Sequence, residues 1–213
     1  MASRPGGQVD LLAAGLGRRP VRGQFASQGS DDAMLVIAAR DGDRAAFGRL
    51  YDRYARMVHG VLLAKVPVVE VDDLVQEVFL LALRRLSTLR EAGSFGAWLA
   101  TIARNLAKDY YRRSVSEDCL GNDTPENDIE GGNTERDHAD PATAILEAVR
   151  SLPDAYRETL ILRLVEGMTG PEIAARTGLT HGSVRVNLHR GMQQLRAKLS
   201  PSSSRNRSEQ ETP

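Results

Sequence analysis

Cysteine and aromatic residues are scarce in this sequence, and their scarcity limits the structures that it can form. Cys119 is the single cysteine among 213 residues, which excludes an intrachain disulfide and a zinc site built on cysteines. Aromatic residues make up 5% of the chain, so a hydrophobic core must depend on Leu, Val, Ile and Ala. A reducing compartment fits this composition, and we expect a cytoplasmic protein.

A long uninterrupted apolar run is also absent. The apolar stretch at residues 9–16 contains Asp10 and is surrounded by glycines, which makes it a poor core for a signal peptide. Elsewhere no run is long enough to cross a bilayer as a helix. The sequence therefore predicts a soluble protein without membrane insertion.

The chain has no net charge, because 28 Lys and Arg residues balance 28 Asp and Glu residues. Evenly spread, such charges would argue against a polyanionic partner. They are segregated instead: acids crowd the segment from Glu117 to Asp140, where Arg136 is the single base. Basic residues crowd two other segments, 104–113 and 176–198. The charge of each segment is therefore the quantity that indicates partners, and it permits nucleic acid.

Strand-like alternation of apolar and polar residues is absent, and apolar residues recur instead at spacings of three and four. One such stripe begins at Phe47, a second helix is expected to begin at Asp72 as its N-cap, and a third to begin near Ser94. Trp98 lies at the edge of the third stripe, and we assign it to the core. These patterns predict an all-α fold.

Changes in composition predict two small helical domains joined by a flexible acidic linker. Residues 1–30 and 200–213 are rich in Gly, Arg, Ser or Pro and are expected to be disordered tails. The first helical domain is expected over 31–114 and the second over 141–199. Between them, residues 115–140 combine acids with Gly and Pro and have almost no large apolar residue, as is typical of a linker.

Residues 169–190 carry the signals of a helix-turn-helix. Thr169 and Glu172 have the spacing of a capping box, so a helix begins there. Gly178 stands where that helix must end and the chain must turn, and Thr180 is placed to cap a second helix. The C-terminal domain is therefore predicted to be a helix-turn-helix domain.

The outward face of this second helix carries groups that suit the major groove of DNA. Arginine pairs with guanine, asparagine with adenine, and hydroxyl or basic side chains with phosphates. The alternative is an amphipathic helix with a solvated polar face, but the helix caps and the absence of acids favour DNA. The candidate DNA-reading residues are Thr180, His181, Ser183, Arg185, Asn187, His189 and Arg190.

Four sequence blocks, in this order, resemble the extracytoplasmic-function sigma factors of bacterial RNA polymerase. They are residues 46–54 (AFGRLYDRY), 72–80 (DDLVQEVFL), 95–105 (FGAWLATIARN) and Leu152-Pro153 ahead of the helix-turn-helix. The resemblance covers residues 31–199. It implies that the first domain binds the polymerase and melts the −10 element, that the second reads the −35 element, and that the linker threads into the enzyme. A plain solvating spacer is the alternative role for the linker.

The resemblance implies that the helix at 72–79 docks on the clamp of the large polymerase subunit. A solvated helix face is the alternative, and an Asp/Glu metal site is disfavoured because no third ligand is placed nearby. Leu81 stands where the family often has a basic residue, which suggests an exposed apolar contact. The candidate polymerase-binding residues share the face turned away from the apolar stripe: Asp73, Gln76, Glu77, Leu80 and Arg84.

The resemblance also implies that the loop at 89–94 captures a base flipped from the −10 strand. Flipping needs a cationic surface to hold the strand, and a solvated face is again the alternative. Of Tyr110 and Tyr111, one is expected to pack and the other to touch DNA, in an order left open. The candidate −10 residues are Arg90, Glu91, Ser94, Thr101, Arg104, Asn105, Lys108 and Arg112.

The sequence thus predicts a promoter-specificity subunit, with no enzymatic activity, cofactor or metal of its own. The expected partners are bacterial core RNA polymerase and promoter DNA, duplex at −35 and single-stranded at −10. An anti-sigma protein is left open, and the tether would let the two domains close around it. Val186-Asn187 replaces the Ser-Arg that the family often has, which suggests a different −35 preference. A stand-alone helix-turn-helix regulator is the alternative function.

Overall fold

The described part of the chain is built of α-helices and short 3-10 turns, in agreement with the all-α prediction. The structure is a computed structural model, and it describes residues 24–118 and 141–200. The described residues contain no strand. The predictions of disordered ends and of the acidic linker fall largely on residues 1–23, 119–140 and 201–213, which lie outside the described residues.

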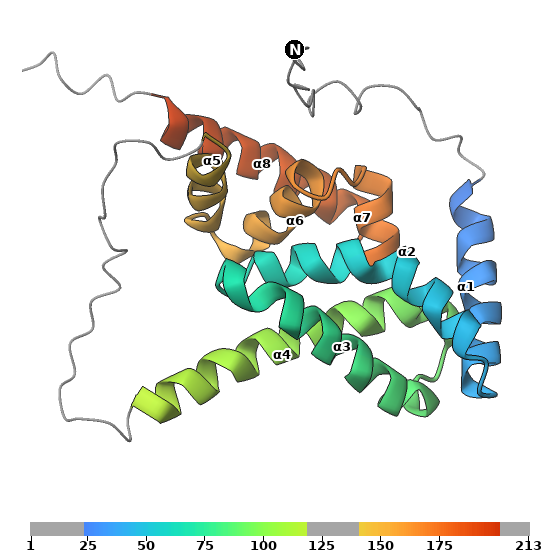
Figure 1. Cartoon of the computed structure of the whole chain (residues 1–213). Coiled ribbons are helices and arrows are strands. Elements are labelled where there is room, and N and C mark those ends of the chain that lie inside the picture. Colours follow the sequence, from blue (N-terminus) through green and yellow to red (C-terminus); the bar gives the residue numbers. More distant parts are fainter. Residues whose placement is uncertain (1–23, 119–140, 201–213) are drawn as a thin grey trace, which may run out of the picture.

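Within these described ranges, four helices form the first lobe and four more form the second (Figure 1). The first lobe contains α1 (Gln24–Arg40), α2 (Arg44–Leu63), α3 (Val71–Arg85) and α4 (Phe95–Asp118), with 3-10 turns at Val68–Glu70, Leu86–Thr88 and Ala92–Ser94. The second lobe contains α5 (Pro141–Arg150), α6 (Asp154–Leu164), α7 (Gly170–Thr177) and α8 (His181–Leu199).

The predicted apolar stripes form the core of the first lobe. Leu50 and Met57 of α2 are fully buried in the same core as Phe95 and Leu99 of α4. Asp43 caps α2, because its carboxylate accepts bonds from the N–H groups of the first turn at 2.8 and 3.1 Å. The stripe that begins at Val75 of α3 is likewise buried, and it continues to Leu86 in the 3-10 turn that follows the helix. Trp98 is half-buried against this core, as predicted.

Three helix ends differ from the expected positions. Helix α3 begins at Val71 with Glu70 at its N-cap, so Asp72 lies in the first turn and is not the cap. The reason is the 3-10 turn that leads directly into α3 and makes the backbone helical earlier. Helix α1 begins at Gln24, within the predicted tail, and α4 continues to Asp118, into the predicted linker. Neither extension contains the proline that would end a helix.

The helix-turn-helix has the predicted local geometry. The Thr169 N–H donates to the Glu172 carboxylate at 2.7 Å, and the Thr169 hydroxyl accepts from the Glu172 N–H, which completes the capping box. Gly178 ends α7 in the left-handed region at φ 76°, where a side chain would strain the backbone. Thr180 caps α8 by accepting from the Ser183 N–H at 3.1 Å.

Small residues allow the helices of the second lobe to cross closely. A Cβ added at Gly191 of α8 would lie 2.9 Å from Leu160 Cδ1 and 3.1 Å from Tyr156 Cβ, both in α6. Val184 and Leu195 of α8 are buried in the same core. Leu199 is exposed because it lies in the last turn, beyond the packed part of the helix.

The two lobes pack directly against each other. Helix α2 crosses the middle of the molecule, with α6 and α7 on one side and α3 and α4 on the other (Figure 1). Two glycines mark the close approach: a Cβ added at Gly60 would lie 2.7 Å from Leu162 Cδ2, and one at Gly96 would lie 2.7 Å from the Arg176 carbonyl oxygen. The lobe contact therefore depends on positions without side chains.

Candidate nucleic-acid and polymerase interfaces

The outward face of α8 is a solvent-accessible surface without acids. The whole helix, His181–Leu199, contains no Asp or Glu. Among the residues predicted to read DNA, His181, Arg185, His189 and Arg190 are exposed. Their exposure follows from the opposite face, where Val184 packs into the core. The face therefore offers donors and positive charge to an anionic partner.

Two of the other candidates, Thr180 and Ser183, have a local role at the start of α8. The hydroxyl of Thr180 lies 2.8 Å from that of Ser183, so both side chains take part in the helix cap. Asn187 is half-buried, because it lies beside the part of α8 that packs on the core. The prediction that Asn187 belongs to the open outward face is corrected to a position at its edge.

Sequence reasoning missed Val186 as a member of the exposed face. It lines a shallow hollow with Arg185, His189 and Arg190. Its side chain is 44% exposed, although it is apolar. The signal that could have found it is helical spacing, since residues three and four apart lie on one face.

Most residues of the candidate −10 surface lie exposed on α4. Thr101, Asn105 and Lys108 are exposed at spacings of four and three, so they share one face. Arg112 continues this row and pairs with Asp109 at 3.0 Å. The structure therefore brings these four side chains together on one side of the helix.

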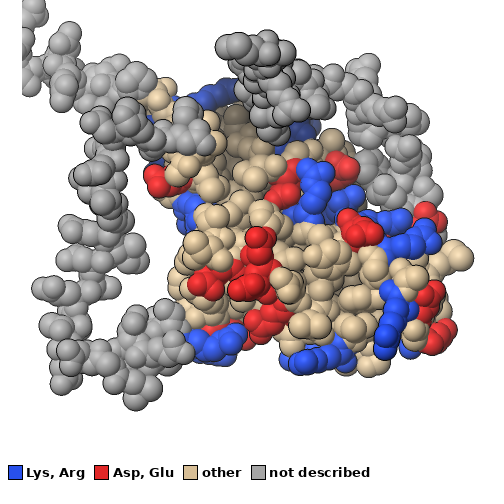
Figure 2. Space-filling model, viewed as in Figure 1, with Lys and Arg blue, Asp and Glu red and all other residues tan. Residues whose placement is uncertain are grey.

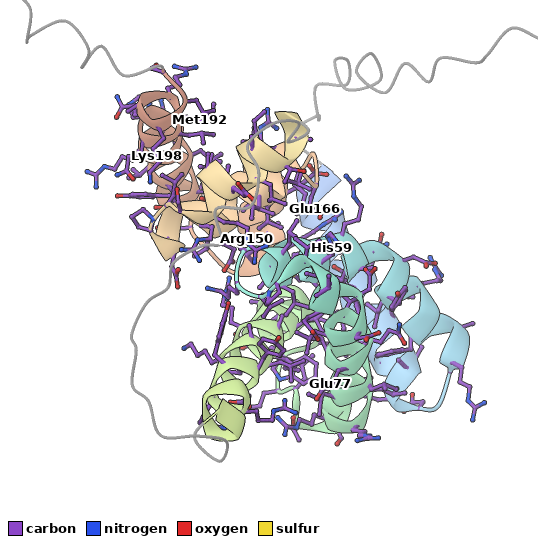
Figure 3. All side chains as sticks on the ribbon, turned by 60° about the vertical axis from the view of Figure 1, so that its left-hand side comes forward. His59, Glu77, Arg150, Glu166, Met192 and Lys198 are labelled. Atoms are coloured by element: carbon purple, nitrogen blue, oxygen red, sulfur yellow. The ribbon has the colours of Figure 1, made fainter. Side chains whose placement is uncertain are left out.

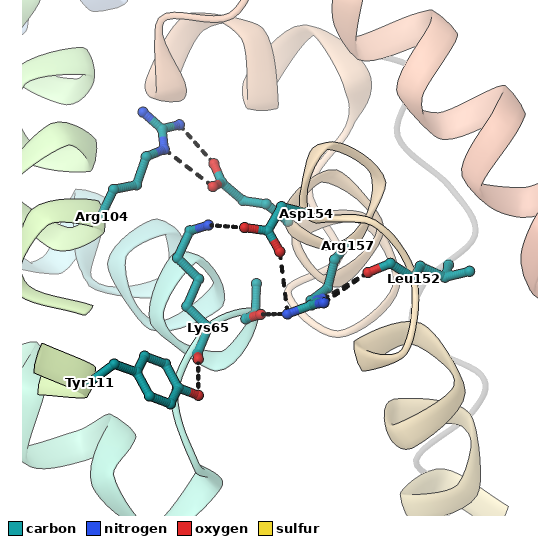
Figure 4. Close-up of polar contacts among 8 residues, drawn as sticks. Lys65, Arg104, Tyr111, Leu152, Asp154 and Arg157 are labelled. Carbon is teal, nitrogen blue, oxygen red and sulfur yellow. Dashed lines mark hydrogen bonds and ion pairs between the residues drawn. The ribbon is translucent and has the colours of Figure 1, made fainter. Parts of the chain in front are cut away.

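Arg104 is the exception in this row, because it is bonded to the other lobe. Its guanidinium donates two bonds to the Glu158 carboxylate of α6, at 3.1 and 2.7 Å (Figure 4). Glu158 is buried and Arg104 is half-buried. The role of Arg104 as a −10 cation stays a prediction, and in this arrangement a bidentate pair occupies its donors.

The loop before α4 is exposed at Arg90, Glu91 and Ser94, as its predicted role requires. The Ser94 hydroxyl donates to the Glu91 carboxylate at 3.2 Å. Arg40 of α1 positions the loop by donating to the carbonyl oxygens of Leu86, at 3.1 Å, and of Leu89. No local pattern indicated this role for Arg40, because the two segments lie more than forty residues apart.

The two adjacent tyrosines of α4 both contact protein. Tyr110 is half-buried against the core, and the rings of Tyr110 and Tyr111 meet edge to face at 5.6 Å. The Tyr111 hydroxyl donates to the Lys65 carbonyl oxygen at 2.7 Å, while 48% of the residue stays exposed. Of the two, Tyr111 therefore has the ring surface that a nucleotide could reach.

The outer face of α3 carries both polar and apolar side chains. Asp73, Gln76 and Arg84 are exposed, and Glu77 is half-buried 4.0 Å from Arg113. Leu80 is 55% exposed and Leu83 is 48% exposed on the same helix. Leu81 is half-buried against the core, so the expectation of an exposed apolar contact at Leu81 is corrected: Leu80 and Leu83 provide it.

The end of α2 is capped by cationic side chains of the second lobe (Figure 4). Carbonyl groups at a helix end lack partners within the helix, and positive charge there is favourable. Arg157 donates to the Ala64 carbonyl oxygen at 3.2 Å, and Arg150 donates to that of Val66. Lys65 pairs in turn with Asp154 at 3.6 Å. Charged contacts thus join the lobes at several points besides Arg104.

A histidine and a buried glutamate meet at the lobe boundary. Figure 3 shows His59 and Glu166 there, and Nδ1 of His59 lies 2.6 Å from Oε1 of Glu166. Arg56 donates to the Glu166 carbonyl oxygen and lies 3.7 Å from its carboxylate. The hydrogen bond to Glu166 raises the pKa of His59 above its ordinary value, although partial burial opposes the shift.

The charges on the face drawn in Figure 2 are mixed in sign, so no single sign dominates it. Binding of an anionic partner therefore depends on particular helix faces. Across residues 24–118 and 141–200, no three His, Cys, Asp or Glu side chains are grouped to hold a metal ion. In the same residues, no helix combines the length and apolar character needed to span a bilayer.

Comparisons with known proteins match both lobes. The family model for Sigma-70 region 2 matches residues 50–116, and that for Sigma-70, region 4 matches residues 142–195. The chain is 36% identical over 179 residues to the ECF RNA polymerase sigma factor BldN of Streptomyces coelicolor, covering 80% of this chain and 66% of that protein. It is 31% identical over 188 residues to the ECF RNA polymerase sigma-E factor of Haemophilus influenzae, covering 80% and 96%.

A solved structure has a similar fold. CnrH, in complex with the cytosolic domain of CnrY, superposes with a TM-score of 0.54 at 26% sequence identity. The match covers 79% of this chain and 97% of that one. The likeness therefore extends over both lobes.

Proposed function

Because this chain belongs to the extracytoplasmic-function sigma factors of bacterial RNA polymerase, we propose that it directs core polymerase to promoters through two separate DNA-binding faces. The exposed face of α8 reads the duplex −35 element. Helix α4 and the loop before it hold the single-stranded −10 element. The chain contributes no catalytic group and acts in the cytoplasm, where the polymerase is.

The observation that carries the −35 assignment is the acid-free, exposed face of α8 on a capped helix-turn-helix. A recognition helix contacts base edges with residues near its N-terminus. Arg185 is exposed in that part of α8 and presents a guanidinium that suits guanine. Arg190, five residues further on, suits the phosphate backbone.

The −10 assignment depends on the row of exposed residues on α4 and on the exposed side chains of Arg90, Glu91 and Ser94 in the loop before it. Asn105 and Lys108 of that row face solvent. Arg104 belongs to the same helix but is paired with Glu158. We therefore assign the packed arrangement of the lobes to a state that precedes promoter melting, and an arrangement with separated lobes to the state that holds the −10 strand.

We assign polymerase binding to the outer face of α3. Leu80 and Leu83 expose apolar surface between polar neighbours, and contacts that bury such surface stabilise an interface. Asp73, Gln76 and Arg84 surround it and supply specificity. The segment between α4 and α5 acts as the tether that allows both lobes to reach their sites on the enzyme.

An inhibitory protein is the remaining partner that we propose. CnrH, which this chain resembles over both lobes, was solved with the cytosolic domain of CnrY. A partner that stabilises the packed lobes would keep Arg104 bonded to Glu158 and withhold the −10 surface. Copurification from the native host would identify such a partner.

Reconstituted transcription tests the proposed function directly. Core polymerase with this chain should copurify and should give run-off transcripts from promoters that core polymerase alone does not use. Gel shifts with the chain alone and with the holoenzyme separate this role from that of a stand-alone regulator, which would bind duplex DNA without the polymerase. Association with core that directs transcription from no promoter would overturn the proposal.

A further inference from the structure

An apolar side chain lies at the centre of the face that we propose to read the −35 element. Val186 is 44% exposed, whereas Val184 and Leu195 of the same helix are buried in the core. Two residues after Val184, Val186 lies about 200° further round the helix. It therefore points almost directly away from the core.

The surroundings of Val186 leave room for a base edge. It lines a shallow hollow with Arg185, His189 and Arg190, so cationic or basic groups surround the apolar one. Gly182, four residues earlier, lies on the same face and has no side chain. A Cβ added there would meet only the Thr180 hydroxyl, at 3.9 Å. The approach to Val186 is thus open on its N-terminal side.

Neither packing nor helix propensity accounts for valine at this position. Its exposed side chain contributes little to the core, and a β-branched residue is a weaker helix former than alanine. Valine makes no hydrogen bonds, so it does not recognise phosphates or the polar edges of bases. The apolar group that the major groove does present is the C5-methyl group of thymine.

A protein partner is the other occupant that an exposed valine could have. Docking of a protein favours a contiguous apolar patch. The next strongly exposed apolar residue of α8 is Leu199, thirteen residues on, which corresponds to about 20 Å along the helix. The surface around Val186 is instead cationic, which favours DNA.

We propose that Val186 contacts the C5-methyl group of one thymine in the −35 element and gives the chain a preference for thymine at that position. This inference rests on the proposed role of α8 as the −35 reading helix. Arg185 and Arg190 hold the DNA in place beside the contact, and Val186 distinguishes the base by its methyl group.

Replacement of thymine by deoxyuridine tests the contact, because it removes the methyl group and leaves the hydrogen-bonding edge unchanged. Holoenzyme made with the wild-type chain first selects its −35 element from a randomised duplex library. Each thymine of the selected element is then replaced in turn. At one position we expect affinity to fall by about threefold to fourfold, the factor for one buried methyl group.

The Val186→Ala variant should lose this discrimination, so that thymine and deoxyuridine at that position bind it equally. Val186→Ile, which keeps an apolar side chain, should retain a preference for thymine. Leu199→Ala is the matched control, because it truncates an exposed apolar residue at the far end of the same helix and should leave the deoxyuridine penalty unchanged. Thermal melting of each variant checks the fold.

The different failures are distinguishable. If no thymine of the selected element is sensitive to deoxyuridine, or if the penalty persists in Val186→Ala, the contact is refuted while the role of α8 stands. If the selected −35 element contains no thymine, the contact is likewise refuted while the role of α8 stands. If the wild-type holoenzyme selects no −35 element at all, the proposed function of α8 fails together with the inference.

Discussion

The two helices that we assign to DNA differ in whether their arginines are available. Arg185 and Arg190 of α8 are exposed on a helix without acids. Arg104 of α4 donates two hydrogen bonds to Glu158, a buried acid of the other lobe. On the proposed roles, the −35 face is therefore complete within its own lobe, whereas Arg104 would join the −10 face only if the lobes separated.

This difference indicates an order of events. A charge-assisted bidentate pair is stronger than a neutral hydrogen bond, and Glu158 would be left buried without a partner if Arg104 alone moved away. Rearrangement of the whole lobe exposes both groups to water and avoids that cost. The polymerase contacts that we propose on the outer face of α3 would not require this rearrangement, because Leu80 and Leu83 are already exposed.

The largest expected effect comes from a bulky side chain introduced between the lobes. Gly60→Leu places a side chain where even a Cβ would lie 2.7 Å from Leu162 Cδ2, so the lobes should separate. Small-angle scattering of the isolated chain should then show a larger radius of gyration. Gly48→Leu is the matched control in the same helix, since a Cβ at Gly48 meets nothing within 4 Å. Equal scattering from both variants would contradict the role of the lobe contact.

The next largest effect is expected from α8, whose proposed DNA-reading face is already exposed. Arg185→Ala should reduce discrimination between cognate and scrambled −35 sites by about 1 to 3 kcal/mol, the value of one bidentate base contact. Gel shifts with holoenzyme measure it. Asn187→Ala should cost less, because Asn187 is half-buried at the edge of the face. Unchanged discrimination in Arg185→Ala would remove α8 as the reading helix.

A smaller effect is expected when Glu158, the acid in the contact between α4 and α6, is replaced by a neutral residue. Glu158→Gln should weaken the packed state by about 1 kcal/mol, because Arg104 keeps a hydrogen bond but loses the ion pair. The variant should bind a single-stranded −10 oligonucleotide more tightly than the wild-type chain does. Glu147→Gln removes the same charge from an exposed site of the second lobe and serves as the control. A gain of equal size in both variants would assign the effect to bulk charge.

The smallest effect is a dependence on pH. Glu166 raises the pKa of His59 in the packed state, with Asp72 contributing in the same direction and Arg56 also facing Glu166. Protonated His59 therefore stabilises the packed lobes fully below its ordinary pKa of about 6.5, and this stabilisation is lost as pH rises through the raised pKa. Scattering should show slightly more extended chains at alkaline pH. His59→Gln should abolish this dependence, and its persistence would assign the titration to another group.

Much of the fold followed from local patterns in the sequence. The apolar stripe from Val75 to Leu86 predicted the buried side of α3, and the Thr169–Glu172 spacing predicted the start of α7. Errors arose where a neighbouring segment changed a local outcome. Asp72 lost the cap position because a 3-10 turn leads into α3, and Asn187 lies nearer to the core than its polarity indicated.

By itself, the sequence determined the helices, the caps of the helix-turn-helix and the acid-free face of α8, because these features depend on residues within one or two turns of each other. Only the tertiary structure decided that Arg104 is paired and Arg185 is exposed. Arg104 and Glu158 are 54 residues apart and belong to different lobes, so no local pattern connects them. The packing of the two lobes brings them together, and the buried acid occupies one of the two cations that we assign to DNA.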